Sequence, residues 1–183
     1  MSKLVFPTPP KRAAKLLMLH PSRSEILAFR NIKHGGRWDF PGGKEEDADD
    51  DSLLQTLRRE VREELVFSED TRLQIETVDR LVDRCVEMTS YSFTPLGSEI
   101  EWWVQYFLVW LDDPLFSAIS DVSLRPSEAS LSSLRWMSVE SICADWRSSM
   151  AHAAYSDHDI RLMTKALRGA THPYTDSDAD KTR

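Results

Sequence analysis

The segment from residue 52 to residue 65 has the clearest helical pattern in the chain. Ser52 and Gln55 have the spacing of a capping box, in which a serine side chain accepts a hydrogen bond from the first turn of a helix. Apolar residues then recur at helical spacing, at Leu53, Leu54, Leu57, Val61 and Leu65. Any fold for this chain must therefore bury one side of an amphipathic helix at this place.

The length and composition indicate one globular domain. A chain of 183 residues can bury a core without a disulfide or a structural metal. The longest apolar stretch, residues 102–111, is interrupted by Gln105 and falls far short of the roughly 20 residues of a membrane-spanning helix. The early prolines leave no apolar run of signal-peptide length, so we expect a cytoplasmic or nuclear protein without a membrane partner.

The two cysteines, Cys85 and Cys143, lack the spacing of metal ligands. Reduced thiols are the simplest expectation, and a disulfide between them is the alternative.

Charge is unevenly distributed along the chain. The net charge of -7 disfavours nonspecific binding to a nucleic-acid backbone. Up to Lys44 there are nine lysines and arginines against two acidic residues, whereas the remainder has 14 against 28. Such polarity suits an anion held beside a metal site, and solvated surface charge explains it equally well.

Around the helix, the pattern predicts one α/β domain over residues 12–170, after an extended lead-in at 1–11 and before a disordered polar tail at 171–183. The expected extended elements are a hairpin of 13–19 with 26–30, a short piece at 38–40, one or two strands within 73–88, and strands at 101–111 and 134–137. The expected loops are 31–37 and the acidic stretch 45–51, and further helices are expected at 138–146 and 157–168.

Three carboxylates fall on one face of the amphipathic helix. Glu60, Glu63 and Glu64 lie within about 100° of arc, since positions i, i+3 and i+4 share a side. They repel one another unless a cation lies among them, and an all-oxygen ligand set favours Mg²⁺ or Mn²⁺. The alternative is a solvated acidic edge neutralised by neighbouring arginines.

The residues around these glutamates resemble the signature of the Nudix hydrolase family, G-x5-E-x7-R-E-U-x-E-E-x-G-U, where U is a bulky aliphatic residue. Gly43 matches the opening glycine, and Phe67 stands at the final apolar position. The second half is matched in register by Arg59, Glu60, Val61, Glu63 and Glu64. The preceding segment 37–44 is similar to the usual lead-in to this box. The resemblance implies an αβα sandwich with a mixed central β-sheet.

The chain departs from the box at three points. The gap from Gly43 to Arg59 is two residues longer than the pattern, and counting back from Arg59 puts Asp51 in the place of the first glutamate. Val66 replaces the glycine that would allow a left-handed end to the helix, so we expect a different helix end. These departures support an alternative function, a catalytically weakened or inactive Nudix-type module that binds a nucleotide or an RNA end and regulates a partner.

The resemblance also implies roles for particular residues. Glu60, Glu63, Glu64 and the carbonyl of Gly43 would hold one or more Mg²⁺ or Mn²⁺ ions, and Arg59 would brace the glutamates. The general base would be a glutamate of the box or one from a later loop, for which Glu128 is the candidate. The implied reaction is hydrolysis of the diphosphate bond in a nucleoside diphosphate linked to another group.

Candidate substrate contacts come from basic and aromatic residues near the box. Arg37 and Lys44 are candidates for phosphate, while Trp38 and Trp103 are candidates for stacking on a base, with core packing as the alternative for both tryptophans. Because only the N-terminal part is basic, a small nucleotide is favoured over an RNA end as substrate. A homodimer remains an open alternative to a monomer.

Overall fold

The computed structural model describes residues 9–22, 24–94 and 97–149. The helix expected at 157–168, the tail at 171–183 and most of the lead-in lie outside these residues. Within the described chain, no helix is long and apolar enough to cross a lipid bilayer.

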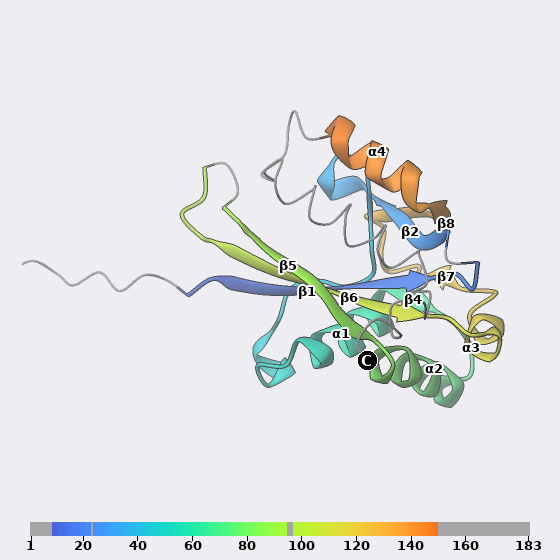
Figure 1. Cartoon of the computed structure of the whole chain (residues 1–183). Coiled ribbons are helices and arrows are strands. Elements are labelled where there is room, and N and C mark those ends of the chain that lie inside the picture. Colours follow the sequence, from blue (N-terminus) through green and yellow to red (C-terminus); the bar gives the residue numbers. More distant parts are fainter. Residues whose placement is uncertain (1–8, 23, 95–96, 150–183) are drawn as a thin grey trace, which may run out of the picture.

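A mixed β-sheet forms the centre of the molecule (Figure 1). Its strands run in the order β3-β2-β1-β6-β5, and β8 pairs with β2. β1 and β6 are parallel, whereas the other neighbours are antiparallel. The strands are β1 Lys11–Leu19, β2 Glu25–Asn31, β3 Arg37–Asp39, β5 Val86–Phe93, β6 Trp102–Trp110 and β8 Leu131–Ser138.

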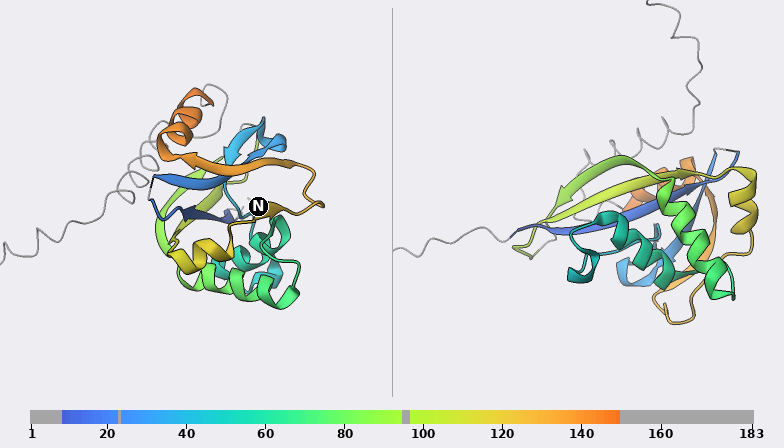
Figure 2. Two further views of the ribbon diagram at one scale, coloured as in Figure 1. Left: turned by 90° about the vertical axis from the view of Figure 1, so that its right-hand side faces the viewer. Right: turned by 90° about the horizontal axis from the view of Figure 1, so that it is seen from below.

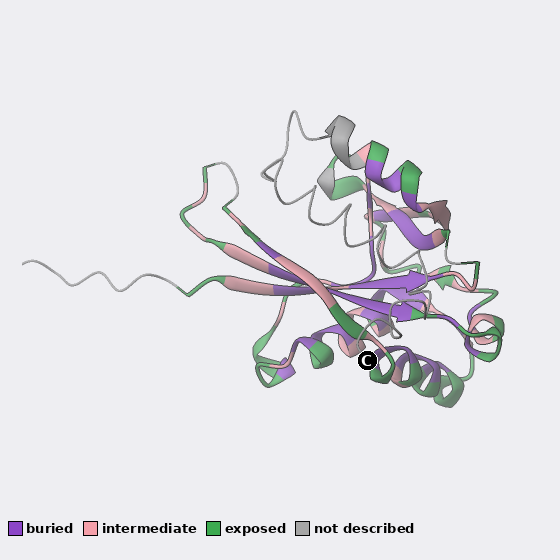
Figure 3. Ribbon diagram, viewed as in Figure 1, coloured by how far each residue is buried: buried purple, intermediate pink, exposed green. Residues whose placement is uncertain are grey.

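Helices cover both faces of this sheet (Figure 2). On one side lie α1 (Leu53–Glu64), α2 (Thr71–Asp83) and the short α3 (Asp113–Ala118), and on the other lies α4 (Val139–Ser149). Two apolar clusters fill the spaces, one facing α1 and α2 and one facing α4. Of the strands between them, β1, β2 and β6 are largely buried (Figure 3). The predicted αβα sandwich with a mixed sheet is confirmed.

The prediction of strands within 73–88 is wrong for most of that segment. Residues Thr71–Asp83 form α2, and β5 begins at Val86. Asp70 caps the helix by accepting hydrogen bonds from the backbone of Arg72 and Leu73. The buried residues are spaced as on one helix face, at Gln74, Thr77, Val78, Leu81 and Val82. Burial of this face outweighs the strand preference of the β-branched residues.

The predicted hairpin of β1 and β2 exists only at its base, where Leu19 pairs with Ile26. Over its whole length β1 instead pairs with β6. β1 and β3 both pair with the same edge of β2, because β8 pairs with the opposite edge. The sheet therefore divides between β1 and β3.

The chain that follows β3 enters this division and runs along the free edge of β1. The backbone N–H of Leu16 donates to the carbonyl of Pro41 at 2.8 Å, and that of Ala14 donates to Gly43 at 3.0 Å. The N–H of Glu45 donates to Arg12 at 2.9 Å. These bonds fix residues 41–45 much as a strand would be fixed.

Helix α1 begins and ends as the sequence suggests. The hydroxyl of Ser52 accepts a hydrogen bond from the backbone N–H of Gln55. The helix stops at Glu64, where Leu65 takes an extended backbone with φ of -118°. Val66 continues this extension in β4 (Leu65–Val66), which pairs with β7 (Ser123–Leu124). The expectation of a different helix end is confirmed.

Both cysteines are free thiols, Cys85 half-buried and Cys143 buried. Burial raises the pKa of Cys85 to about 11, so the thiol stays protonated at neutral pH.

Candidate active site

Gly42 connects the segment after β3 to the end of α1. Its backbone N–H donates to the Glu64 carboxylate (Oε2) at 2.8 Å. Its φ is 125°, and a Cβ at this residue would lie 2.1 Å from the carbonyl oxygen of Ala14. Only glycine fits here, and this close approach is what brings the segment to Glu64.

Gly43 lies against a second glutamate of α1, Glu60. A Cβ at Gly43 would lie 2.5 Å from the carboxyl carbon of Glu60, so the Glu60 carboxylate occupies the space of a missing side chain. The carbonyl of Gly43 accepts one hydrogen bond, from Ala14. Glu60 and Glu64 are therefore brought to two adjacent glycines by their spacing on α1.

Glu63 shares the helix face but not this environment. Its side chain is 55% exposed, and its carboxylate (Oε2) lies 3.3 Å from Nη1 of Arg59. The three carboxylates therefore have different surroundings: Glu60 and Glu64 approach the glycines, while Glu63 contacts solvent and Arg59, which also binds Glu60.

Arg59 lies at the centre of a network of hydrogen bonds. Its Nε and Nη2 donate to the two oxygens of Asp49 at 3.1 and 3.0 Å. Nη1 donates to Glu60 at 2.9 Å as well as to Glu63, and Nη2 also donates to the carbonyl of Lys44 at 2.8 Å. One guanidinium therefore ties the loop before α1 to two of the three glutamates.

The acid that pairs with Arg59 from the preceding loop is Asp49, not Asp51. Asp49 follows Gly43 by six residues, which is the spacing of the box when counted forward from the glycine. The two additional residues are Asp50 and Asp51, with φ of 50° and 56°. They form a left-handed turn before α1, and the side chain of Asp51 is exposed. Counting backward from Arg59 could not show on which side of the acid the insertion lies.

The electrostatic environments of these carboxylates differ. Burial raises the pKa of Glu64 to about 8, against the lowering effects of Lys15 and of the Gly42 hydrogen bond. Burial also raises the pKa of Glu60, against the effect of Arg59. The hydrogen bonds from Arg59 lower the pKa of Asp49 to about 2.

The donors around the glycines are the kind that a hard divalent cation prefers. Glu60, Glu63, Glu64 and the carbonyl of Gly43 supply oxygen alone, as Mg²⁺ and Mn²⁺ favour. Glu60 lies against the Gly43 backbone in a space that a side chain would fill. In the side-chain arrangement of residues 9–22, 24–94 and 97–149, no three acidic, histidine or cysteine residues are gathered as a complete ligand set. The residues fit such an ion by donor chemistry.

Lys15 is a site residue that the sequence analysis did not single out. Its ammonium group donates to the Gly42 carbonyl at 2.8 Å, to the Phe40 carbonyl at 3.1 Å and to Asp39 at 3.1 Å. The sequence feature that could have indicated this role is that Lys15 is the sole charged residue within the apolar run 13–19.

The candidate substrate residues are dispersed. Trp38 is 4% exposed, with the guanidinium groups of Arg30 and Arg135 at 4.1 and 4.7 Å from its ring centroid. Trp103 is half-buried, packs against the cluster that faces α1 and α2, and has Arg12 at 5.9 Å. Both tryptophans therefore contribute to packing.

The other three candidates lie in different elements. Arg37 is half-buried on β3, and Lys44 is exposed next to the carbonyl that Arg59 binds. Glu128 is half-buried in the turn before β8. Among the described residues, no ion pair or hydrogen bond joins its carboxylate to the α1 glutamates.

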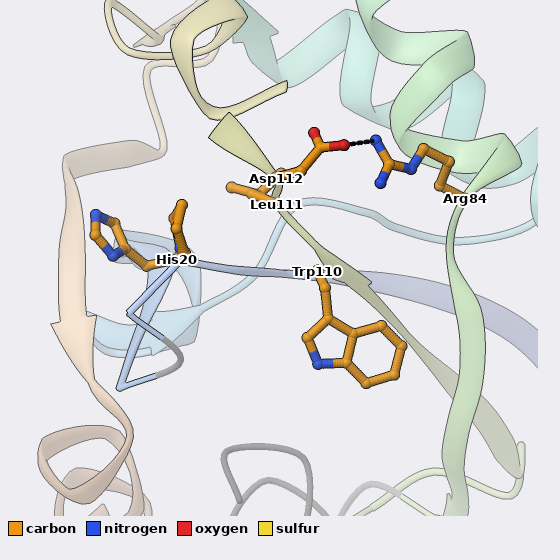
Figure 4. Close-up of a pocket in the computed structure, with 6 residues that line it drawn as sticks. His20, Arg84, Trp110, Leu111 and Asp112 are labelled. Carbon is orange, nitrogen blue, oxygen red and sulfur yellow. Dashed lines mark hydrogen bonds and ion pairs between the residues drawn. The ribbon is translucent and has the colours of Figure 1, made fainter. Parts of the chain in front are cut away.

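A separate recess lies beyond the carboxyl ends of β1 and β6 (Figure 4). It has a volume of about 230 Å³ and is lined by His20, Pro21, Arg84, Trp110, Leu111 and Asp112. Arg84 and Asp112 form an ion pair at 2.8 Å across it. His20 is six residues beyond Ala14 on the chain, roughly 20 Å along a strand, so this recess is distinct from the glycine segment.

Comparisons with known proteins show the family and the fold of this chain. The family model of the NUDIX domain matches residues 9–157. A NUDIX hydrolase from Alicyclobacillus acidocaldarius is 17% identical with a TM-score of 0.59, over 91% of this chain and 94% of that one. The NUDIX domain of Shewanella oneidensis NrtR, solved in complex with ADP ribose, is 12% identical with a TM-score of 0.55, over 94% of each chain.

A C. elegans Ap4A hydrolase is 16% identical with a TM-score of 0.51, over 87% of this chain and 98% of that one. A search of curated proteins found no match. The family model spans most of the chain, including the glycine segment and α1. This chain therefore belongs to the Nudix family, whose hydrolases act on phosphoric anhydride bonds.

Proposed function

We propose that this chain is a Mg²⁺- or Mn²⁺-dependent pyrophosphohydrolase that cleaves the diphosphate bond of a nucleoside diphosphate linked to another group. The observation that carries the proposal is the placement of Glu60 and Glu64, two largely buried carboxylates, against the backbone of Gly42 and Gly43. Burial raises the pKa of both carboxyls, so their charges are poorly compensated by the chain itself. A divalent cation supplies the missing charge.

The local charge balance supports this. Lys15 is paired with Asp39, and Arg59 with Asp49. Glu60 and Glu63, whose charge is shared in part with Arg59, then remain as an excess of negative charge, and Glu64 adds to it once it loses its proton. Such an excess at a buried position favours binding of a cation.

The proposed roles follow from position. Glu60, Glu63, Glu64 and the carbonyl of Gly43 would hold the ion, which when bound orients a diphosphate and makes a water molecule more nucleophilic. Arg59 positions Glu60 and Glu63, and Lys44 and Arg37 are the candidate phosphate contacts. A box glutamate or Glu128 would serve as general base.

A small nucleotide is the favoured substrate class. The charge of the whole chain disfavours a long nucleic acid. Two proteins of the same fold support the nucleotide class, since one was solved with ADP ribose and another is an Ap4A hydrolase.

The second candidate is a binding module without turnover. The observation that favours it is the engagement of both Glu60 and Glu63 by Arg59, which competes with an ion for their oxygens. Turnover distinguishes the two functions, because a binding module gains thermal stability from a nucleotide but forms no product.

The test is a phosphate-release and mass-spectrometric screen with Mg²⁺ or Mn²⁺. The substrates are oxidised nucleoside triphosphates, ADP-ribose, dinucleoside polyphosphates, capped RNA and diphosphoinositols. We expect conversion of a nucleotide by the wild type and a loss of about 100-fold or more in Glu63→Gln, because a candidate metal ligand is removed. Glu69→Gln, an exposed glutamate outside α1, is the matched control and should retain activity. Absence of conversion by folded protein whose melting temperature rises with a nucleotide would support the binding module instead.

A further inference from the structure

Lys15 is a charged residue in a place where the fold would favour an apolar one. It is the sole charged residue in the run 13–19 of β1, and its side chain is 16% exposed. An ammonium group with so little contact with water is unfavourable unless its donors are used. Lys15 uses them on one short segment: the carboxylate of Asp39 and the carbonyls of Phe40 and Gly42.

The peptide groups of Gly42 are held from two sides. Its N–H donates to Glu64, and its carbonyl accepts from Lys15, each at 2.8 Å. Glycine has the largest backbone freedom of any residue, so Gly42 has no side chain that would hold its φ at 125°. The bond to Lys15 therefore restrains the residue that in turn orients Glu64 and leads into Gly43.

Lys15 acts on Glu64 through its charge as well as through this geometry, because it is the largest influence that lowers the pKa of Glu64 and exceeds the opposing effect of Asp39. Its ammonium group lies 3.1 Å from the Asp39 carboxylate, so the two form a neutral pair. Their charges act on Glu64 in opposite directions, since Lys15 lowers its pKa and Asp39 raises it. Removal of Lys15 would release the segment 39–42 and would also remove a charge that lowers the pKa of Glu64.

We propose that Lys15 is a positioning residue of this site: it fixes the Gly42 backbone, and through it the Glu64 carboxylate and the Gly43 carbonyl, in the arrangement that receives a divalent cation. The identity of the bound group rests on the proposed function. The hydrogen bonds that carry the inference are present without it.

The first experiment measures Mn²⁺ affinity by isothermal titration in wild type, Lys15→Met and Lys33→Met. Lys33 is exposed, so its loss is matched in charge but leaves the segment untouched. We expect Lys15→Met to bind Mn²⁺ about tenfold or more weakly, as is typical when a residue that orients a metal ligand is lost. Lys15→Arg, which keeps a charged donor, should restore most of the affinity. If Lys15 acted as a competing cation, its removal would tighten binding, and equal or tighter binding by Lys15→Met would overturn the proposal.

The second experiment does not depend on metal. Amide hydrogen exchange of Gly42 is followed by NMR in metal-free protein, where we expect at least about tenfold faster exchange in Lys15→Met than in Lys33→Met. Unchanged exchange would overturn the proposal. Should Lys15→Met fail to fold, Lys15→Gln is used with the same expectations. If the wild type binds no Mn²⁺, the proposed function fails, while the exchange rates still decide the role of Lys15.

Discussion

Asp49 and Glu64 are both buried carboxylates near the glycine segment, yet they differ in the number of hydrogen bonds that they receive. Asp49 is 2% exposed and receives hydrogen bonds from Arg59, from the hydroxyl of Thr56 at 3.0 Å and from the N–H of Glu46 at 2.9 Å. Glu64 is 9% exposed and receives a single one within the described residues, from Gly42. The pKa is lowered to about 2 in Asp49 and raised to about 8 in Glu64.

The two shifts have different causes: hydrogen bonds from Arg59 lower the pKa of Asp49, whereas burial away from water raises that of Glu64. The protein itself neutralises Asp49, because the guanidinium group of Arg59 supplies both a positive charge and hydrogen bonds. Glu64 is buried with less compensation than its charge requires. We infer that the region of Asp49 stabilises the loop before α1, whereas the region of Glu64 is the one that can accept a cation.

The largest effects are expected from substitution of the two neighbouring glycines, one on stability and the other on turnover. In Gly43→Ala the new methyl group displaces the Glu60 carboxylate, which we expect to lower turnover by about 100-fold while stability changes little. In Gly42→Ala the methyl group meets the backbone of Ala14 at a φ closed to alanine, which should cost about 3 kcal/mol or more of folding free energy. Turnover and denaturant-induced unfolding are measured for both.

Gly36→Ala is the control for backbone strain alone, because Gly36 has a φ of 70° and no atom within 4 Å of the added Cβ. Its expected cost is about 1 kcal/mol. Full turnover in Gly43→Ala would contradict the placement of Glu60 in the site.

The next largest effect is expected for Asp49. Asp49→Asn removes the charged partner of Arg59, and we expect a loss of about 2 kcal/mol in the free energy of unfolding at neutral pH. Asp51→Asn should change it by less than about 0.5 kcal/mol, because the side chain is exposed and asparagine tolerates its left-handed backbone. Urea unfolding of the two variants is the measurement, and the reverse order would restore Asp51 as the acid of the box.

These pairs also show where prediction from sequence succeeds and where it stops. Helix α1, and a helix end without the left-handed residue that a glycine at position 66 would allow, follow from local patterns and were predictable. The alternation within 73–88 favours strands, whereas α2 forms because Asp70 caps it and its buried residues have helical spacing. Local propensity is the weaker effect when a whole face is buried.

The rest of the site depends on contacts between distant parts of the chain. A count of residues could not place the insertion, since only the left-handed turn at Asp50 and Asp51 decides between the two acids. Lys15 acts through acceptors 24 to 27 residues away. Such pairings arise from the division of the sheet between β1 and β3, which no periodicity encodes.

The pH dependence of metal-free stability tests Glu64 without any substitution in its surroundings. Between about pH 4.5, the ordinary pKa of a glutamate, and pH 8, folded Glu64 retains a proton that the unfolded chain has lost. Raising the pH across this window therefore removes stability, on the order of a few kcal/mol at most. Asp49 contributes in the opposite sense, but at more acidic pH, because its stabilisation is lost as the pH falls from about 4 through 2.

Glu64→Gln keeps an acceptor for the Gly42 N–H but cannot titrate. We expect the melting temperature of metal-free wild type, measured from pH 5 to pH 8, to fall relative to that of this variant. Parallel curves would contradict the raised pKa of Glu64.

The most direct test of the account is a calorimetric titration of Mn²⁺ into metal-free protein at pH 6 and pH 8. We expect the wild type to bind Mn²⁺, more tightly at pH 8 because the ion competes with the proton on Glu64. Glu60→Gln and Glu64→Gln should each weaken binding by about tenfold or more, while Glu69→Gln should bind as the wild type does. Absence of binding by the wild type, or wild-type affinity in both α1 variants, would contradict a divalent-cation site at Gly42 and Gly43.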